Sequence, residues 1–264
     1  TIDNTTFTVS ANGVNIQGTV TYNVSTRTAT FKPSSSLSKG TTYTVTVSDQ
    51  CKNIYGVKLV KSIIWSFTTV ETASGIWRGT FTSNVVNKSY QVLGVITEDG
   101  EARFLSEDAA QFNGNASLNG NKVSATLKAF APYLFPDGTN YGTIQLTGTV
   151  KTRQSLTGTY SGVGDTGTFN LQYDSGYERS SSISLLVGNW SNTDEYGNSI
   201  YLTVNSSGSF TGNVNNVCTF SGTISIIDPS YNAYRLKNVY LNSNCGQLSG
   251  TYSGLGVLGD SQQQ

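Results

Sequence analysis

The sequence has no histidine and no methionine, and its 264 residues include only three cysteines and four prolines. Without histidine, serine–histidine–aspartate triads and cysteine–histidine pairs are excluded. Zinc sites are disfavoured as well, because their usual ligands are histidines and paired cysteines, and no Cys-x-x-Cys occurs. No Gly-x-x-x-x-Gly-Lys phosphate loop is present. We therefore expect a non-enzymatic protein with no cofactor and no catalytic or metal site.

Charge is also scarce. Charged residues make up 12% of the chain and the net charge is zero, against a usual charged share of roughly 25%. Clustered lysine and arginine are missing, which excludes nucleic acid as a partner. No apolar run approaches the ~20 residues of a membrane-spanning helix. The serine, threonine, asparagine and glycine that replace the charges are typical of secreted or cell-surface β-proteins. With no initial methionine or signal peptide, we expect a mature or trimmed piece of a longer protein.

One signature occurs twice. Gly-Ile-Trp at residues 75–77 is followed by Gly-Thr-Tyr-Ser-Gly at 158–162, and Gly-Asn-Trp at 188–190 is followed by the same pentapeptide at 250–254. An internal repeat of this length predicts a duplicated structural unit.

The first 70 residues alternate apolar and hydroxyl side chains with period two. This pattern predicts half-buried strands, and several short strands separated by turns favour a β-sandwich. The alternating runs lie at residues 7–9, 20–24, 29–31, 41–47 and 63–69.

The order of motifs in this segment resembles the bacterial Ig-like domain of the SbsA type. The motifs are Leu-Ser-Lys-Gly-Thr-Thr-Tyr-Thr-Val-Thr-Val at 37–47, Gly-Val-Lys-Leu at 56–59 and Trp-Ser-Phe-Thr-Thr at 65–69. The resemblance implies an Ig-like sandwich over residues 1–70 that acts as a spacer or stalk on a surface protein. The family's usual first strand has no counterpart here, and Cys51 stands where the family tends to carry an apolar residue.

Residues 75–177 predict an up-and-down barrel of eight antiparallel strands. Asp-Gly and Asn-Gly hairpin signals separate the strand-like runs, and closure removes exposed sheet edges. The runs are residues 77–82, 91–97, 102–106, 112–118, 122–130, 143–151, 155–161 and 167–173. The Gly-x-Trp start resembles that of lipocalin-like and avidin-like barrels, and the block also looks like barrels of bacterial surface lipoproteins. The lipocalin loop and closing-strand motifs are not evident, so no ligand is carried over.

Residues 186–264 predict a second, shorter copy that lacks its closing strand. An open sheet edge attracts any strand that fits. Two interpretations stay open for the two incomplete modules: the chain is cut from a longer protein, or neighbouring subunits donate strands and build a filament.

The three cysteines divide by position. Cys218 and Cys245 both fall in the second copy and are natural disulfide partners in an oxidising compartment. Cys51 is left over, as a free thiol or as one that pairs with another chain.

Two loops carry aromatic residues that could bind sugars or proteins, or could simply pack. This possible binding rim comprises Tyr133, Phe135, Tyr141, Tyr231 and Tyr234. The three tryptophans are expected to be core anchors.

Carboxylates cluster without an evident site. Glu98, Asp99 and Glu101 surround a hairpin turn, with residues 107–108 just beyond, and a solvated turn is the favoured interpretation. Residues 137–140 and 194–198 offer oxygen ligands for Ca²⁺ without the EF-hand spacing, so loop chemistry is favoured there too.

We therefore predict an all-β protein in which an Ig-like sandwich precedes two related barrel-like units. The expected function is structural: a stalk, adhesin or filament subunit at the bacterial cell surface, with other protein subunits or surface proteins, including copies of itself, as partners. The alternative is a barrel that binds a small apolar ligand or a partner protein.

Overall fold

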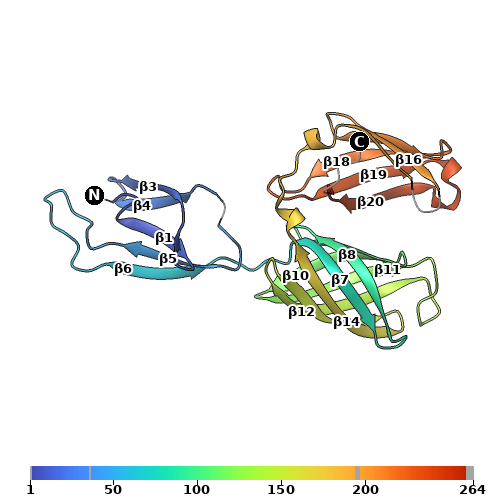
Figure 1. Cartoon of the computed structure of the whole chain (residues 1–264), viewed down its shortest axis with the longest axis horizontal. Coiled ribbons are helices and arrows are strands. Elements are labelled where there is room, and N and C mark those ends of the chain that lie inside the picture. Colours follow the sequence, from blue (N-terminus) through green and yellow to red (C-terminus); the bar gives the residue numbers. More distant parts are fainter. Residues whose placement is uncertain (1, 36, 194–196, 260–264) are drawn as a thin grey trace. The chain divides into compact units, whose positions relative to one another are not determined.

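The computed structural model describes residues 2–35, 37–193 and 197–259. It is all-β, as predicted, and divides into two compact units, Thr1–Thr72 and Ala73–Gln264 (Figure 1). In the described residues the helical elements are three short 3₁₀ turns, η1 (Ser175–Glu178), η2 (Ile183–Leu185) and η3 (Ser243–Leu248). None of the described helices is long and apolar enough to cross a membrane.

The first unit is a sandwich of a four-stranded sheet, ordered β2-β1-β5-β6, and the hairpin β3-β4. The alternating runs of the sequence form its strands because each places its β-branched and aromatic side chains on one face. These strands are β1 (Phe7–Ala11), β2 (Val14–Asn15), β3 (Gly18–Asn23), β4 (Thr28–Pro33), β5 (Thr42–Val47) and β6 (Ile63–Thr68).

The core of this sandwich comes from its two central strands. Phe7 and Val9 on β1 and Tyr43 and Val45 on β5 are buried, and Phe31 of the hairpin packs on them. Strand β6 lies at the edge of the sheet and pairs with β5. All six of its residues are exposed, although four of them are apolar or aromatic.

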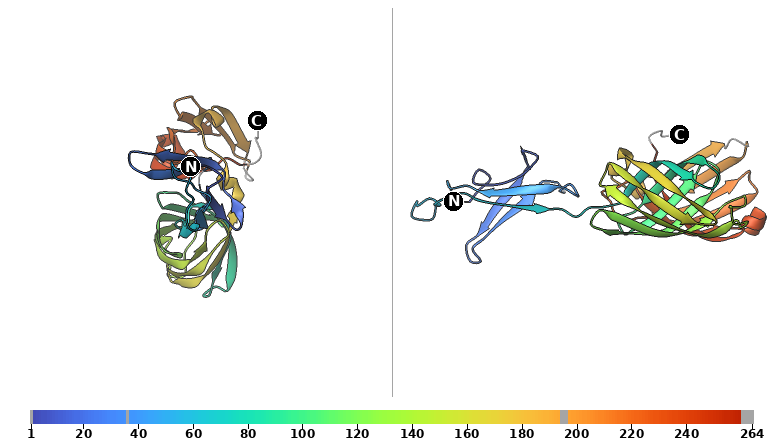
Figure 2. Two further views of the ribbon diagram at one scale, coloured as in Figure 1. Left: turned by 90° about the vertical axis from the view of Figure 1, so that its left-hand side faces the viewer. Right: turned by 90° about the horizontal axis from the view of Figure 1, so that it is seen from below.

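Eight strands of the second unit form a closed barrel, ordered β10-β11-β12-β13-β14-β7-β8-β9, which the left panel of Figure 2 shows nearly end-on. All eight predicted runs are present. The strands are β7 (Gly75–Ser83), β8 (Lys88–Ile96), β9 (Glu101–Ser106), β10 (Gln111–Asn119), β11 (Lys122–Phe130), β12 (Tyr141–Lys151), β13 (Ser155–Gly162) and β14 (Asp165–Asp174).

Strict alternation fills the barrel interior. On β11, Val123, Ala125, Leu127 and Ala129 are buried, and every residue between them is exposed. Closure gives every strand a paired neighbour on each side, and the alternation places one face of the strand in the core. Trp77 is fully buried, and its indole N–H donates to the Ala73 carbonyl at 2.9 Å, which closes one end of the barrel.

The second copy is an open, six-stranded sheet, ordered β15-β16-β17-β18-β19-β20. Its strands lie close to the predicted runs, but in the part of the chain that the structure describes the sheet does not close. Its edges are β15 and β20. The strands are β15 (Gly188–Thr193), β16 (Ser199–Val204), β17 (Ser209–Val214), β18 (Cys218–Ile226), β19 (Tyr234–Leu241) and β20 (Gly250–Gly256).

The repeated pentapeptide does not occupy equivalent strands. In the barrel it lies on β13, the seventh strand counted from the tryptophan strand β7, whereas in the sheet it lies on β20, the sixth strand counted from β15. Because successive strands are antiparallel, β13 runs in the same direction as β7, and β20 runs opposite to β15. The sequence repeat therefore marks two related meanders but not one duplicated topology.

The barrel and the sheet share a small apolar cluster. Tyr177 of η1 stacks on Tyr231 at 5.0 Å between ring centroids, and Ala233 packs beside Ile76 in the same buried cluster. Next to it, Arg235 of β19 forms ion pairs at 2.8 Å with Asp99 and Glu101 of the barrel.

Candidate functional site

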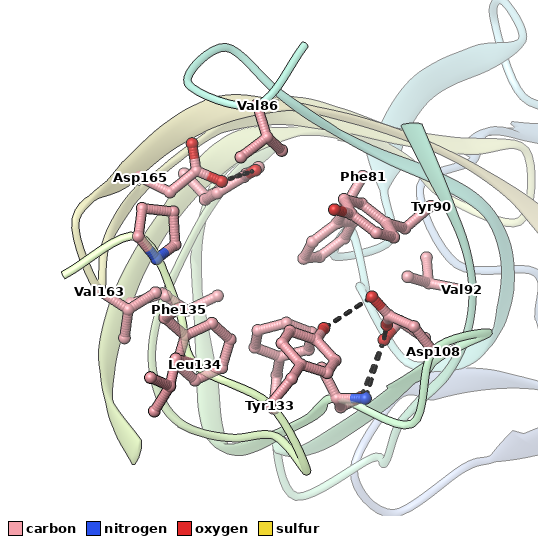
Figure 3. A pocket seen from close by; sticks show the side chains of 16 residues that line it. Phe81, Val86, Tyr90, Val92, Asp108, Tyr133, Leu134, Phe135, Val163 and Asp165 are labelled. Atoms are coloured by element: carbon pink, nitrogen blue, oxygen red, sulfur yellow. Dashed lines mark hydrogen bonds between the residues drawn. The ribbon is translucent and has the colours of Figure 1, made fainter. Parts of the chain in front are cut away.

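A cavity of about 240 Å³ opens at the end of the barrel where β7 ends and β8 begins (Figure 3). Its walls come from the ends of seven barrel strands or the turns beside them and from the loop between β11 and β12, so residues distant in the sequence converge there. The lining residues are Phe81, Val86, Tyr90, Val92, Ser106, Asp108, Ala110, Phe112, Tyr133, Leu134, Phe135, Pro136, Ile144, Tyr160, Val163 and Asp165.

Aromatic rings form much of the wall and floor. Phe81 lies at the centre of the group, with ring centroids of Phe112 at 5.6 Å and Tyr160 at 5.5 Å. Tyr133 and Phe135 meet edge to face at 6.0 Å. The Phe81–Tyr160 pair is stacked and the Phe81–Phe112 pair is tilted; rings at such separations attract one another, and all of these rings line the cavity.

Two carboxylates stand on different sides of this aromatic mouth (Figure 3). Asp108 accepts hydrogen bonds from the Tyr133 hydroxyl at 2.7 Å and from the Ser106 hydroxyl. Asp165 accepts from the Tyr160 hydroxyl at 2.9 Å and from the Ser83 hydroxyl at 2.8 Å. These four hydroxyl donors are neutral, and Asp165 also accepts from the Thr166 amide at 2.8 Å.

The two tyrosines are held in their protonated form. Burial, and then the hydrogen bond to Asp108, raises the pKa of Tyr133. Burial, and then the hydrogen bond to Asp165, likewise raises the pKa of Tyr160. Each tyrosine therefore remains a donor to its carboxylate over the whole physiological pH range, and the two pairs are fixed features of the mouth.

The loop of residues 131–140 crosses the mouth; a hydrogen bond joins its two ends, and a second one anchors its middle to the turn after β13. The Ala131 amide donates to the Asn140 carbonyl at 3.0 Å, and the Asp137 amide donates to the Val163 carbonyl at 3.3 Å. Val163 has a φ of 49°, in the left-handed region that β-branched residues avoid. Such a conformation costs about 1–3 kcal/mol and is concentrated at functional sites. The side chain of Val163 lines the cavity.

The predicted binding rim is divided by the fold. Tyr133 and Phe135 line the cavity, while Tyr141 begins β12, is exposed and does not line it. Tyr231 stacks on Tyr177. Tyr234 is buried, and its hydroxyl accepts from the Ser182 amide at 3.2 Å. The last two tyrosines therefore pack the junction between barrel and sheet.

Asp99 is an exposed turn residue, as the solvated-turn interpretation expects, although it also pairs with Arg235. The interpretation does not fit Glu101, which is largely buried in its ion pair with Arg235, or Asp108, which lines the cavity. Sequence reasoning also missed Asp165. In the sequence Gly-Asp-Thr-Gly at 164–167 an aspartate is expected for local turn reasons. Tyr160 lies on the adjacent strand β13 of the same hairpin, and pairing of β14 with β7 closes the barrel there and brings the Ser83 hydroxyl to Asp165.

The remaining predicted sites carry no chemistry here. Asp137 accepts from the Thr139 amide at 3.0 Å, as an ordinary turn residue does. The possible Ca²⁺ ligands at 194–196 lie outside the described residues, and no metal-binding group of three histidine, cysteine or acidic residues occurs among those described. Cys218 and Cys245 form a disulfide, and Cys51 is a buried free thiol.

The comparison with protein families gives one match. The model of the family described as Bacterial Ig-like domain matches residues 1–69, the segment in which the sequence resembles that family. No match was found among the curated proteins or the solved structures. The matched family is non-catalytic and occurs in bacterial surface proteins, which indicates a structural or adhesive role at the surface; the disulfide agrees with an extracellular location.

Proposed function

We propose that the chain is a non-enzymatic subunit of a bacterial surface assembly and that a second copy adds a strand to β6 of its Ig-like unit. The family match and the disulfide support the surface setting. The observation that carries the proposal is the exposed apolar edge strand β6. Proteins generally shield such edges, because an exposed hydrophobic edge strand pairs with other chains.

The core-facing side of β6 is only half covered. Ile63, Trp65 and Phe67 point to the same side as the buried Tyr43 and Val45. Their exposed fractions are nevertheless 51%, 46% and 40% respectively. The ring of Trp65 lies 6.3 Å from that of Phe7, so it touches the core while its outer edge stays open. A strand added beside β6 would bury these three side chains.

The backbone of β6 also has a free side. The Thr69 amide donates to the Thr41 carbonyl at 3.0 Å, and antiparallel pairing alternates from there. The amides of Trp65 and Phe67 therefore face β5, and those of Ile64 and Ser66 face the open edge. β-Strand addition uses such a row of donors and acceptors for affinity.

A second copy is the occupant that the chain's own features favour. The net charge of zero imposes no self-repulsion on association. The sheet of the second unit has further edges at β15 and β20, so one molecule offers several pairing sites. A head-to-tail contact of this kind produces filaments when it does not close into a ring.

Replacing Ser66 with proline tests the proposal, because proline removes an amide that faces the open edge and is tolerated on edge strands. We expect the unmodified protein to form assemblies at micromolar concentration and Ser66→Pro to be monomeric, as measured by mass photometry. Ser66→Ala is the matched control, since both changes remove the side-chain hydrogen bond to Thr44, and it should assemble normally. A monomeric unmodified protein, or equal assembly of the proline variant, contradicts the proposal.

A second function is favoured by the cavity of the barrel. An eight-stranded barrel has an interior just wide enough to hold one small ligand, and an apolar pocket with a few convergent polar groups is the usual form of a ligand site. In this role the Ig-like unit is a spacer and the barrel a binding module. Native mass spectrometry of protein purified from its source tests the role by detecting a retained small molecule.

A further inference from the structure

We propose that the barrel mouth binds a small organic cation, a substituted ammonium group with an apolar body. This inference rests on the barrel's role as a binding module and adds the chemical class of its ligand. Three features of the cavity lead to it: its charge, its aromatic lining and its size.

The charge of the cavity favours a cation. Asp108 and Asp165 both line it, and none of its lining residues is a lysine or an arginine. The partners of both carboxylates are neutral: hydroxyl groups for Asp108, and hydroxyl groups and the Thr166 amide for Asp165. Their negative charge is therefore solvated by dipoles but not cancelled by an ion pair. An anionic ligand would meet two like charges in a partly desolvated site, and a cation would meet two opposite ones.

The aromatic lining favours an alkylated ammonium over a metal ion. A cation over an aromatic face is stabilised by the ring quadrupole, and quaternary ammonium groups are recognised in cages built from such rings. Phe81, Phe112, Tyr90 and Tyr160 line this cavity. Lys88 Nζ lies over the Tyr90 ring, 4.6 Å from its centroid, so one face of this ring already interacts with an ammonium group of the chain. Lys88 itself is exposed and is not among the lining residues.

The volume of the cavity limits the size of the apolar part of the ligand. The cavity measures about 240 Å³, whereas an apolar cavity of roughly 150 Å³ already accommodates benzene. A trimethylammonium head with a short chain or one aromatic ring is therefore the appropriate scale. The mouth is also prearranged for it, since the 131–140 loop is fixed to Val163 and both tyrosines are fixed to their carboxylates. Prearrangement of this kind lowers the cost of ordering on binding.

Isothermal titration calorimetry on the whole chain tests the inference with three probes. Choline and benzyltrimethylammonium carry the cation, and 3,3-dimethylbutan-1-ol is the neutral isostere of choline. We expect both cations to bind, and the neutral alcohol to bind roughly tenfold more weakly than choline or worse. Asp165→Asn and Asp108→Asn should each weaken choline binding several-fold while leaving binding of the alcohol unchanged. Asp49→Asn, a carboxylate of the Ig-like unit, is the control for net charge and should bind as the unmodified protein does.

The outcomes separate the two proposals. Equal binding of choline and its neutral isostere overturns the cation inference and leaves the barrel as a binding module. Binding that survives in the double variant Asp108→Asn/Asp165→Asn also overturns it. If neither cation nor the alcohol binds at millimolar concentration, the inference fails, and retention of some other molecule in native mass spectrometry then decides separately whether the barrel binds anything.

Discussion

The barrel and the sheet begin with the same tryptophan hydrogen bond, but their cores differ. In both, a tryptophan indole N–H donates to the carbonyl four residues earlier: Trp77 to Ala73 at 2.9 Å, and Trp190 to Leu186 at 2.8 Å. Trp77 is fully buried, whereas Trp190 is only half-buried. The motif therefore marks the start of a meander. Whether the later strands close into a barrel decides how deeply the tryptophan is buried and how much it contributes to stability.

Closure explains the difference. In the barrel the inner faces of eight strands meet each other and form one continuous core. In the sheet, Val204 and Phe210 are buried, but most other apolar residues of the same face stay half-exposed, among them Leu202 and Phe220. A sheet with a single covered face cannot exclude water as a closed ring does. A covalent link, the Cys218–Cys245 disulfide, occurs in the sheet.

The largest expected effect separates the two tryptophans. Trp77→Ala should destabilise the barrel by about 3–5 kcal/mol, because it leaves a large cavity in a close-packed core and removes a buried hydrogen bond. Trp190→Ala should cost the sheet about 1–2 kcal/mol, since part of its ring already meets water. Hydrogen exchange of barrel and sheet peptides along a urea series measures each module separately. Equal losses would mean that the sheet has a core like that of the barrel.

The next effect belongs to the sheet alone. The Cys218–Cys245 bond spans 27 residues, and removing a bond that closes a loop of this length costs about 3–4 kcal/mol. Cys218→Ala/Cys245→Ala should therefore lower the stability of the sheet and leave that of the barrel unchanged. Hydrogen exchange of barrel and sheet peptides distinguishes the modules here as well. Cys51→Ala is the control, and a matching loss in the barrel would show that the two modules unfold together.

Strand positions were predictable from the sequence, and strand closure was predictable for the barrel only. Alternation and hairpin residues are local signals, so all eight barrel strands could be placed before the fold was known. The pentapeptide shared by β13 and β20 was misleading, because five residues specify an extended strand but not its number in the meander. The direction of the pentapeptide strand and the closure of the sheet depend on how many strands separate it from the tryptophan strand. That number is a property of the whole module.

The candidate site was half predictable, for a related reason. Tyr133 and Phe135 stand out in a proline-bounded loop as aromatic residues without a strand pattern. Asp108 and Asp165 do not stand out, because aspartate is common in turns for purely local reasons. Asp108 pairs with Tyr133, 25 residues away, and Asp165 pairs with Tyr160 in its own hairpin and with Ser83, 82 residues away. The contacts with Tyr133 and Ser83 depend on how distant strands and loops are arranged in the closed barrel, and the sequence alone does not define that arrangement.

The smallest expected effect compares the last glycine of the pentapeptide in each module. Gly162 has a φ of 139°, and a Cβ there would lie 2.1 Å from the Thr143 carbonyl oxygen, which is rigid backbone. Gly162→Ala should therefore cost the barrel about 1–3 kcal/mol through strain and overpacking. At the matching Gly254 of β20, a Cβ would meet no atom within 4 Å, so Gly254→Ala should change stability by less than about 0.5 kcal/mol or slightly increase it. Thermal unfolding of the two variants measures the difference. A large loss for Gly254→Ala would indicate that another strand packs closely against β20 in solution, and the open edge of the sheet would then be occupied.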